Sequence, residues 1–254
     1  MNFIKSAALL AAIAIPAAAS AFPFTVTKGA KNVVLVHGAY VDASSTWRQV
    51  HDRLWIDGYK VTVVQQTGES LDQDVAATRA AIEAQDGPVV LVGHDTGGAV
   101  ISIAGTSAKV KSLVYVAALQ PAVGESAAQL LASMPALHDA YRIGKDGRQS
   151  ILATKFAEVY AADIPPNRTN FLSVAQKAVA PAALATPGWE AAWRAKPSHA
   201  IVAADDRVIN PELQRWMYKR AGSKVVEIKS SHALNLAKPE EVAAVIVGAA
   251  QEVR

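Results

Sequence analysis

Short apolar runs alternate along this chain with longer stretches in which apolar residues recur every three or four positions. The runs predict strands at residues 31–36, 59–65, 89–92, 112–118, 199–204 and 225–229. After the first of these, Trp47, Val50 and Leu54 would share one face of a helix. Because strands and helices alternate at this spacing, the pattern predicts an α/β fold: a mostly parallel sheet with helices on both faces.

The segment at residues 89–101 organises the rest of the chain. An aliphatic run stops at Gly93, and two polar residues, a Thr and a Gly pair lead into a second apolar stretch. This order predicts a strand, a very tight turn and a helix. Asp95 would occupy the strained apex, with its side chain above the sheet. Gly93 and Gly97 would relieve crowding, because a Cβ there would strike the neighbouring backbone.

This segment resembles the nucleophile elbow of the α/β-hydrolase fold, G-x-Nu-x-G. The resemblance extends over nearly all of residues 31–254, through Val-His-Gly-Ala, Ala-Asp-Asp-Arg-Val-Ile-Asn-Pro-Glu and Ser-His-Ala-Leu-Asn-Leu. These motifs resemble small bacterial α/β hydrolases and are similar to those of plant hydroxynitrile lyases and salicylate-type esterases. Such relatives usually carry Ser where this chain has Asp95. The Asp itself resembles haloalkane dehalogenases, fluoroacetate dehalogenases and soluble epoxide hydrolases.

The resemblance implies a catalytic triad in the order nucleophile, acid, base. Asp95 would be the nucleophile, and His232, in the loop between the last strand and the last helix, would be the base. The acid is expected just after the fifth strand, about five residues before a proline that begins a helix. Counting back from Pro211 selects Asp206, with Asp205 as the alternative.

The same resemblance predicts the groups around the triad. The backbone N–H groups of Ala39 and Thr96 would form the oxyanion hole, where two donors stabilise one developing negative charge. Tyr40 follows in the same loop, where the dehalogenase and epoxide hydrolase branch usually has Pro, and it is a candidate substrate contact. His199, at the start of a predicted strand, is a second candidate contact.

Between residues 120 and 198 the pattern loosens. Prolines cluster, alanines abound and short helical pieces are separated by turn residues. We interpret residues 120–198 as a small helical cap inserted between the core segments 31–119 and 199–254, over the catalytic face. Five large side chains are candidates to line its pocket: Phe156, Phe171, Leu172, Trp189 and Trp193.

The first 21 residues resemble a secretory signal peptide. Lys5 is followed by a short apolar core, and Ala19-Ser20-Ala21 is an A-x-A-type cleavage site. The core is too short to span a bilayer as a helix. We therefore expect a secreted or periplasmic mature protein with no stable membrane anchor after cleavage.

Composition excludes several other functions. The chain has no Cys, so disulfides, thiolate catalysis and Cys-ligated metals are excluded, and none of its six His residues shows H-x-x-x-H spacing. No metal or other cofactor is expected. The net charge of +3 is spread over scattered Lys and Arg, which predicts a small-molecule substrate rather than a nucleic acid.

The chemistry of a carboxylate separates the possible activities. A carboxylate attacks saturated carbon to give an alkyl ester, whereas its attack on a carbonyl would give a high-energy mixed anhydride. The leading hypothesis is therefore a hydrolase acting on an epoxide or a halogenated small molecule. The alternative is an ester or lactone hydrolase in which Asp95 replaces the usual Ser. A third possibility is a catalytically silent binding protein.

Overall fold

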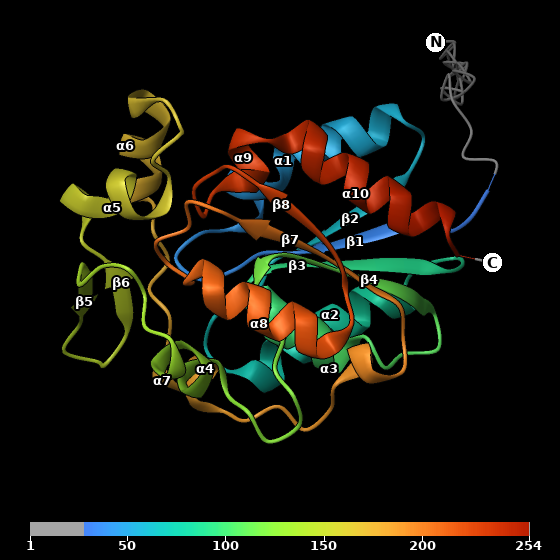
Figure 1. Cartoon of the computed structure of the whole chain (residues 1–254), viewed down its shortest axis with the longest axis horizontal. Coiled ribbons are helices and arrows are strands. Elements are labelled where there is room, and N and C mark those ends of the chain that lie inside the picture. Colours follow the sequence, from blue (N-terminus) through green and yellow to red (C-terminus); the bar gives the residue numbers. More distant parts are fainter. Residues whose placement is uncertain (1–27, 254) are drawn as a thin grey trace, which may run out of the picture.

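A six-stranded parallel sheet forms the centre of the molecule (Figure 1). The computed structural model describes residues 28–253, so the expected signal peptide lies outside the described residues. The strands follow the order β2 (Lys60–Val64), β1 (Asn32–Val36), β3 (Val89–Asp95), β4 (Val110–Ala118), β7 (Ser198–Ala203) and β8 (Lys224–Ile228). Every neighbouring pair in this sheet is parallel, which confirms the predicted sheet type.

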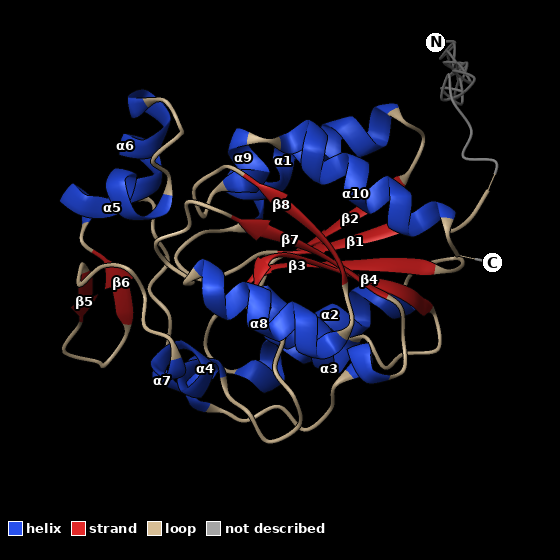
Figure 2. Ribbon diagram, in the orientation of Figure 1, coloured by secondary structure: helices blue, strands red, loops and turns tan. Residues whose placement is uncertain are grey.

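Helices cover both faces of the sheet (Figure 2). One face carries α1 (Ala43–Ile56), α9 (Leu234–Ala237) and α10 (Pro239–Gln251), and the other carries α2 (Leu71–Glu83), α3 (Gly97–Ala104) and α8 (Pro211–Ala221). The four inner strands, β1, β3, β4 and β7, are almost wholly buried, so each face of the sheet builds its own core. Within residues 28–253, none of the helices combines the length and hydrophobicity that a membrane span requires.

The cap elements β5 (Tyr141–Ile143), β6 (Gln149–Ile151), α5 (Ala153–Tyr160) and α6 (Pro166–Val174) lie beyond one end of the sheet (Figure 1). Helices α4 (Ala127–Ser133) and α7 (Pro181–Ala185) pack against each other beside α2, and the short 3₁₀ helix η1 (Ala192–Arg194) packs against α3. The antiparallel pair β5–β6 departs from the predicted all-helical cap. Its turn closes through Gly144 N–H to the Arg148 carbonyl, 2.8 Å, and places Gly147 at a φ of 77°. Glycine adopts that conformation at little cost, so the turn residues favour a hairpin here.

Helix α8 supports the end of β4 through the side chain of Tyr218. The Tyr218 hydroxyl donates to the Ala118 carbonyl at 2.9 Å and accepts from the Ala118 N–H at 2.8 Å. Trp216 in the same helix is large and mostly apolar, yet it is 43% exposed. Its ring lies 4.4 Å from the Arg220 guanidinium, one helical turn on, which gives the ring a cation–π partner at the surface.

Two helical glycines should respond in opposite ways to replacement by alanine. A Cβ on Gly98 in α3 would lie 2.0 Å from the Leu119 carbonyl oxygen, whereas a Cβ on Gly248 in α10 would meet nothing within 4 Å. Gly98→Ala should therefore lower the free energy of unfolding by about 1–3 kcal/mol or more. Gly248→Ala, the matched control, should raise it by about 0.5–1 kcal/mol. Urea unfolding of both variants measures this, and equal effects would contradict the packing at the start of α3.

Candidate active site

The turn between β3 and α3 holds Asp95 in a left-handed conformation, with a φ of 53°. This is an uncommon backbone conformation for a non-glycine residue, and close packing on both sides enforces it. A Cβ on Gly93 would lie 2.6 Å from the Gly97 carbonyl oxygen, and one on Gly97 would lie 2.7 Å from the His37 carbonyl oxygen. These contacts are the crowding that the Gly spacing predicted. The carboxyl group of Asp95 is buried at the end of the sheet.

One oxygen of Asp95 occupies the predicted oxyanion hole. The Ala39 N–H donates to Asp95 Oδ2 at 2.7 Å, and the Thr96 N–H acts in the same direction by lowering the pKa of the carboxyl group. Glycine is required at position 38, because a Cβ there would lie 2.3 Å from Asp95 Cβ. The two expected donors are therefore in place, but they hold the chain's own carboxylate. The other oxygen, Oδ1, faces His232 at 3.9 Å.

His232 is oriented by Asp206. Its Nδ1 lies 2.7 Å from Asp206 Oδ2, and both side chains are fully buried. The second oxygen of Asp206 accepts the N–H groups of Val208 at 2.8 Å and Ile209 at 3.0 Å. These bonds fix the carboxylate, so the imidazole proton is held on Nδ1 and Nε2 is left to act as a base. Of the two candidate acids, the structure brings Asp206 to the site, while Asp205 is exposed.

Gln214 is a site residue that sequence reasoning missed. Its amide nitrogen donates to Asp206 Oδ2 at 2.8 Å and to the Ile209 carbonyl at 2.9 Å, and its amide oxygen accepts the Ala203 N–H at 3.1 Å. The side chain thus ties α8, the end of β7 and the acid together. Its signal in the sequence was a polar residue beside Leu213, on the buried stripe of α8.

The Nε2 atom of His232 is buried and has no hydrogen-bond partner among the residues the structure describes. The 3.9 Å between Nε2 and Asp95 Oδ1 is too long for a direct hydrogen bond, but a water molecule beside the carboxylate could bond to Nε2. From behind, His94 Nε2 lies 3.0 Å from the His232 carbonyl oxygen. The imidazole is therefore held through Nδ1 by Asp206, while Nε2 is available to accept a proton.

Burial and neighbouring charges shift the pKa values of both Asp95 and His232. Burial raises the pKa of Asp95 to about 6, although His232 and the Ala39 N–H oppose that rise. Burial alone would lower the pKa of His232, but the Asp206 carboxylate, by charge and hydrogen bond, brings it above its ordinary value of 6.5. An ionised Asp95 and a neutral His232 therefore coexist only toward neutral and alkaline pH.

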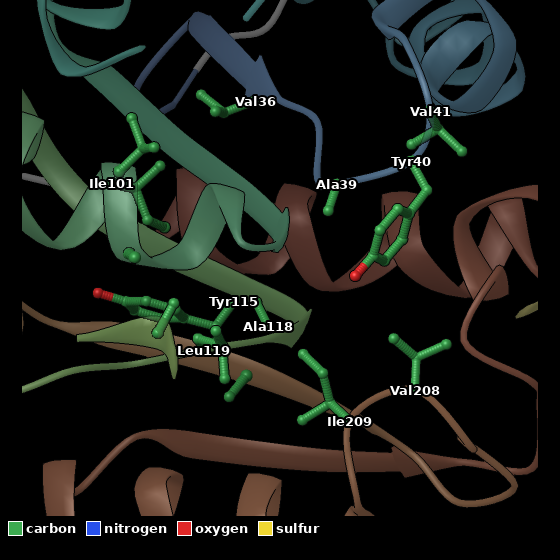
Figure 3. Close-up of a cluster of buried hydrophobic side chains, with 14 of the residues drawn as sticks. Val36, Ala39, Tyr40, Val41, Ile101, Tyr115, Ala118, Leu119, Val208 and Ile209 are labelled. Atoms are coloured by element: carbon green, nitrogen blue, oxygen red, sulfur yellow. The ribbon is translucent and has the colours of Figure 1, made fainter. Parts of the chain in front are cut away.

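Three tyrosines lie near the candidate site, and the charge of Asp95 acts on each of them. Tyr40 has a φ of 66°, and its ring extends from the oxyanion loop with Val208 and Ile209 across from it (Figure 3). The Tyr141 ring is 6.2 Å from that of Tyr40, and the Tyr160 ring stands edge-on to His232 at 4.8 Å. Burial raises the pKa of all three phenols, and the Asp95 charge adds to the effect. The hydroxyl groups are therefore neutral and able to donate a proton.

A small cavity adjoins the oxyanion loop. Its volume is about 20 Å³, which is room for about one water-sized group. Its walls include Tyr40, Thr96, Gln66 and the cap residue Lys177, whose ammonium donates to the Gln66 carbonyl at 2.6 Å. The Gln66 amide nitrogen is buried and has no hydrogen-bond partner within residues 28–253. The cavity therefore presents hydrogen-bond donors next to the site.

Some predicted contacts lie elsewhere. His199 is the second residue of β7, at the opposite end of the sheet from the triad, and its Nε2 lies 3.3 Å from Glu252. The prediction that it contacts substrate is wrong, because a strand's first residues lie far from the end that carries the catalytic loops. Phe171 and Trp189 are 65% and 40% exposed. Phe156, Leu172 and Trp193 are buried, and none of the five candidates lines the cavity.

Comparison with known proteins agrees with this geometry. A family model described as "Alpha/beta hydrolase family" matches residues 33–245. The chain belongs to the alpha/beta hydrolase family. Among curated proteins, this hydrolase is similar to "Alpha/beta hydrolase nvfD" of Aspergillus novofumigatus (strain IBT 16806), with 32% identity over 199 residues that cover 71% of this chain and 78% of the relative.

Solved structures share the fold. A pyrethroid hydrolase from Sphingobium faniae JZ-2 has a TM-score of 0.75 and 23% identity, covering 87% of this chain and 98% of that one. A polyneuridine aldehyde esterase mutant has a TM-score of 0.73 and 19% identity, over 86% and 98% of the two chains. A methylesterase from Arabidopsis has a TM-score of 0.72 and 19% identity, over 87% and 98%. At these identities the likeness establishes the hydrolase fold.

The buried charge of Asp95 should destabilise this hydrolase at neutral pH. The folded protein binds the Asp95 proton more tightly than the unfolded chain, so this group's contribution to stability is complete below pH 3.8 and is lost as pH rises through about 6. The difference between these values corresponds to about 3 kcal/mol. Asp95→Asn should therefore be more stable than the wild type by about 2–3 kcal/mol at pH 8, and by almost nothing at pH 4.

Chemical denaturation at several pH values tests this expectation. Asp205→Asn is the matched control, because Asp205 is exposed and adjoins the acid without bonding to the imidazole. It should show no comparable dependence on pH. A stabilisation by Asp95→Asn that was the same at pH 4 and pH 8 would mean that the charge of the carboxylate is not its cause.

Proposed function

We propose that this alpha/beta hydrolase cleaves an epoxide or a halogenated small molecule through a covalent alkyl ester on Asp95. One observation carries the proposal: Asp95 Oδ2 is held by the Ala39 N–H at 2.7 Å, while Oδ1 is free of the oxyanion hole and faces His232. A carboxylate held in this way has one oxygen ready to attack and one already placed where negative charge will later develop.

In the first step Asp95 Oδ1 attacks a saturated carbon in line with the leaving group. A carbon–oxygen bond to the enzyme forms as the carbon–halogen bond or the epoxide carbon–oxygen bond breaks. A halide leaves as the anion, whereas an epoxide oxygen needs a proton. The hydroxyl groups of Tyr40, Tyr141 and Tyr160 are the candidate donors because each phenol carries its proton at neutral pH, although burial raises their pKa values and makes them weaker acids than a free tyrosine.

In the second step water attacks the ester carbon of Asp95. His232 Nε2 takes the proton from that water, and Asp206 stabilises the imidazolium that results. The charge that develops on Asp95 Oδ2 is stabilised by the N–H groups of Ala39 and Thr96, which already stabilise the carboxylate. Collapse of the tetrahedral intermediate expels the alkoxide, which takes the proton from the His232 imidazolium and leaves as the alcohol, and loss of the remaining carboxyl proton restores the carboxylate.

The substrate is expected to carry a small acceptor group beside its reacting carbon. The cavity next to the oxyanion loop has room for about one such group. Gln66 supplies a buried amide nitrogen that has no partner among the described residues, and Lys177 supplies a positive charge. A carbonyl, hydroxyl or ether oxygen would satisfy these donors.

Ester or lactone hydrolysis is the second candidate. The names of similar structures favour it, since they include a methylesterase and a polyneuridine aldehyde esterase. It requires the substrate's carbonyl oxygen to reach the donors that Asp95 Oδ2 occupies. It also requires a route that avoids a mixed anhydride. The comparisons therefore favour ester hydrolysis, whereas the carboxylate at position 95 favours attack on saturated carbon.

Isotope labelling tests the alkyl-ester route. In a single turnover of a terminal epoxide or a primary alkyl bromide in H₂¹⁸O, one heavy oxygen should enter the Asp95 carboxyl group, because water attacks the enzyme's ester carbon. The new product oxygen should be unlabelled, since it comes from Asp95. Mass spectrometry of the peptide and the product measures both. Label in the product together with an unlabelled peptide would contradict the proposal.

Removing the base should trap the intermediate. His232→Gln retains a polar side chain but cannot accept the proton from water, so the alkyl ester should accumulate. Intact-mass spectrometry should detect the epoxide mass, or the alkyl bromide mass less hydrogen bromide, on residue 95. Asp95→Asn combined with His232→Gln is the control and should remain unmodified.

A serine at position 95 tests the ester candidate. If the scaffold hydrolyses esters, Asp95→Ser should raise kcat/KM for p-nitrophenyl acetate by about a hundredfold or more, because His232 and the empty oxyanion hole would then serve a hydroxyl nucleophile. Asp95→Asn, which lacks a nucleophile, is the matched control. Equal rates for the two variants would remove the support for ester hydrolysis.

A further inference from the structure

A segment of the cap brackets the catalytic His232 on both sides. Before it in sequence, Asp163 Oδ2 accepts the Ser230 hydroxyl at 2.6 Å and the Ser231 N–H at 3.0 Å, and Asp163 Oδ1 bonds to the Ser231 hydroxyl. After it, the Ala233 N–H donates to the Tyr160 carbonyl at 3.0 Å. Residues 160–163 therefore contact the chain immediately before and immediately after the base.

The loop that carries His232 has few other supports. It follows β8, an edge strand whose first four residues are exposed. On the body side, the Ser230 carbonyl accepts the Asp205 N–H at 3.1 Å, and the His232 carbonyl contacts His94. Toward the cap, the Ser230 hydroxyl and the Ser231 N–H and hydroxyl bond to Asp163, and the Ala233 N–H bonds to the Tyr160 carbonyl. The position of the base is thus shared between the sheet and the cap.

The Asp163 carboxylate is suited to hold this loop. Asp163 is an exposed residue, and although partial desolvation of its carboxylate acts to raise its pKa, the hydrogen bonds from Ser230 and Ser231 bring the net pKa below its ordinary value. The group is therefore ionised at neutral pH and only accepts hydrogen bonds, and bonds to a charged acceptor are stronger than neutral ones. Ser230 and Ser231 are both buried, so loss of the carboxylate would leave buried donors without a partner.

The imidazole must be placed accurately for the reaction proposed above. Its Nε2 lies 3.9 Å from Asp95 Oδ1, and the attacking water has to fit between the base and the future ester. A displacement of about 1 Å in such an arrangement can cost about a hundredfold in rate. The Tyr160 ring stands edge-on to the His232 imidazole at 4.8 Å and limits the movement of the imidazole toward the cap.

We propose that Asp163 is a positioning residue that couples the seating of the cap to the orientation of the catalytic base. When the cap is seated, Asp163 holds Ser230 and Ser231, and the loop presents His232 to Asp206 and Asp95. When the cap moves away, the loop loses these bonds together. The importance of this coupling for turnover rests on the proposed function, but the coupling itself concerns only the imidazole and is measurable without a substrate.

Nuclear magnetic resonance of the histidine side chains tests the coupling. The Nδ1 proton that His232 donates to Asp206 across 2.7 Å should give a low-field signal, assigned by its loss in His232→Gln. In Asp163→Ala this proton should exchange with water about tenfold faster or more, as expected when hydrogen bonds to a charged acceptor are lost. Asp163→Asn, which keeps one acceptor oxygen, should fall between this variant and the wild type.

Asp146→Asn is the matched control, because Asp146 is a cap carboxylate whose partner, Arg148, lies in the β5–β6 turn rather than the catalytic loop. It should leave the His232 signal unchanged.

With any substrate that the wild type turns over, Asp163→Ala should lower kcat more than it changes KM. Wild-type exchange and shift of the His232 proton in a folded Asp163→Ala protein, even one with a lower Tm, would reduce Asp163 to a cap anchor and overturn the proposal. Failure of the epoxide and bromide probes would leave this readout unaffected.

Discussion

The structure depends on a carboxylate that is kept in a buried turn by two backbone N–H groups. Asp95 adopts a strained φ of 53° and accepts from Ala39 at 2.7 Å. Glycines at 38, 93 and 97 leave the space that this turn requires. Burial nevertheless raises the pKa of the group to about 6, so the fold holds a charge that it does not fully compensate. Such uncompensated groups are typical of sites where stability is exchanged for reactivity.

The same carboxylate distinguishes this chain from what its scaffold resembles. The family and the fold are those of hydrolases whose similar structures include esterases. In a hydrolase that attacks a carbonyl, the oxyanion hole must accept an oxygen of the substrate. Here Asp95 Oδ2 already accepts from one of those donors. A single side chain at the elbow therefore occupies a position that such a hydrolase needs for an oxygen of its substrate.

The base depends on parts of the chain that are distant in sequence. Asp206 and Gln214 orient the imidazole of His232 from the end of β7 and from α8. Asp163, from the cap, holds the residues just before it. The site is consequently assembled from the sheet, one covering helix and the cap, and its accuracy depends on all three being seated together.

The sequence by itself determined the parallel sheet and the tight turn at Asp95, because aliphatic periodicity and glycine spacing act over a few residues, and its resemblance to the α/β-hydrolase fold implied the order of Asp95, Asp206 and His232. It placed His199 wrongly and left Asp205 and Asp206 as alternatives, since neither question is local. Only the tertiary structure decided that Asp206 meets His232 and that Asp95 fills the oxyanion hole. Those outcomes depend on how side chains from separate elements pack and share hydrogen bonds, which no short stretch of sequence encodes.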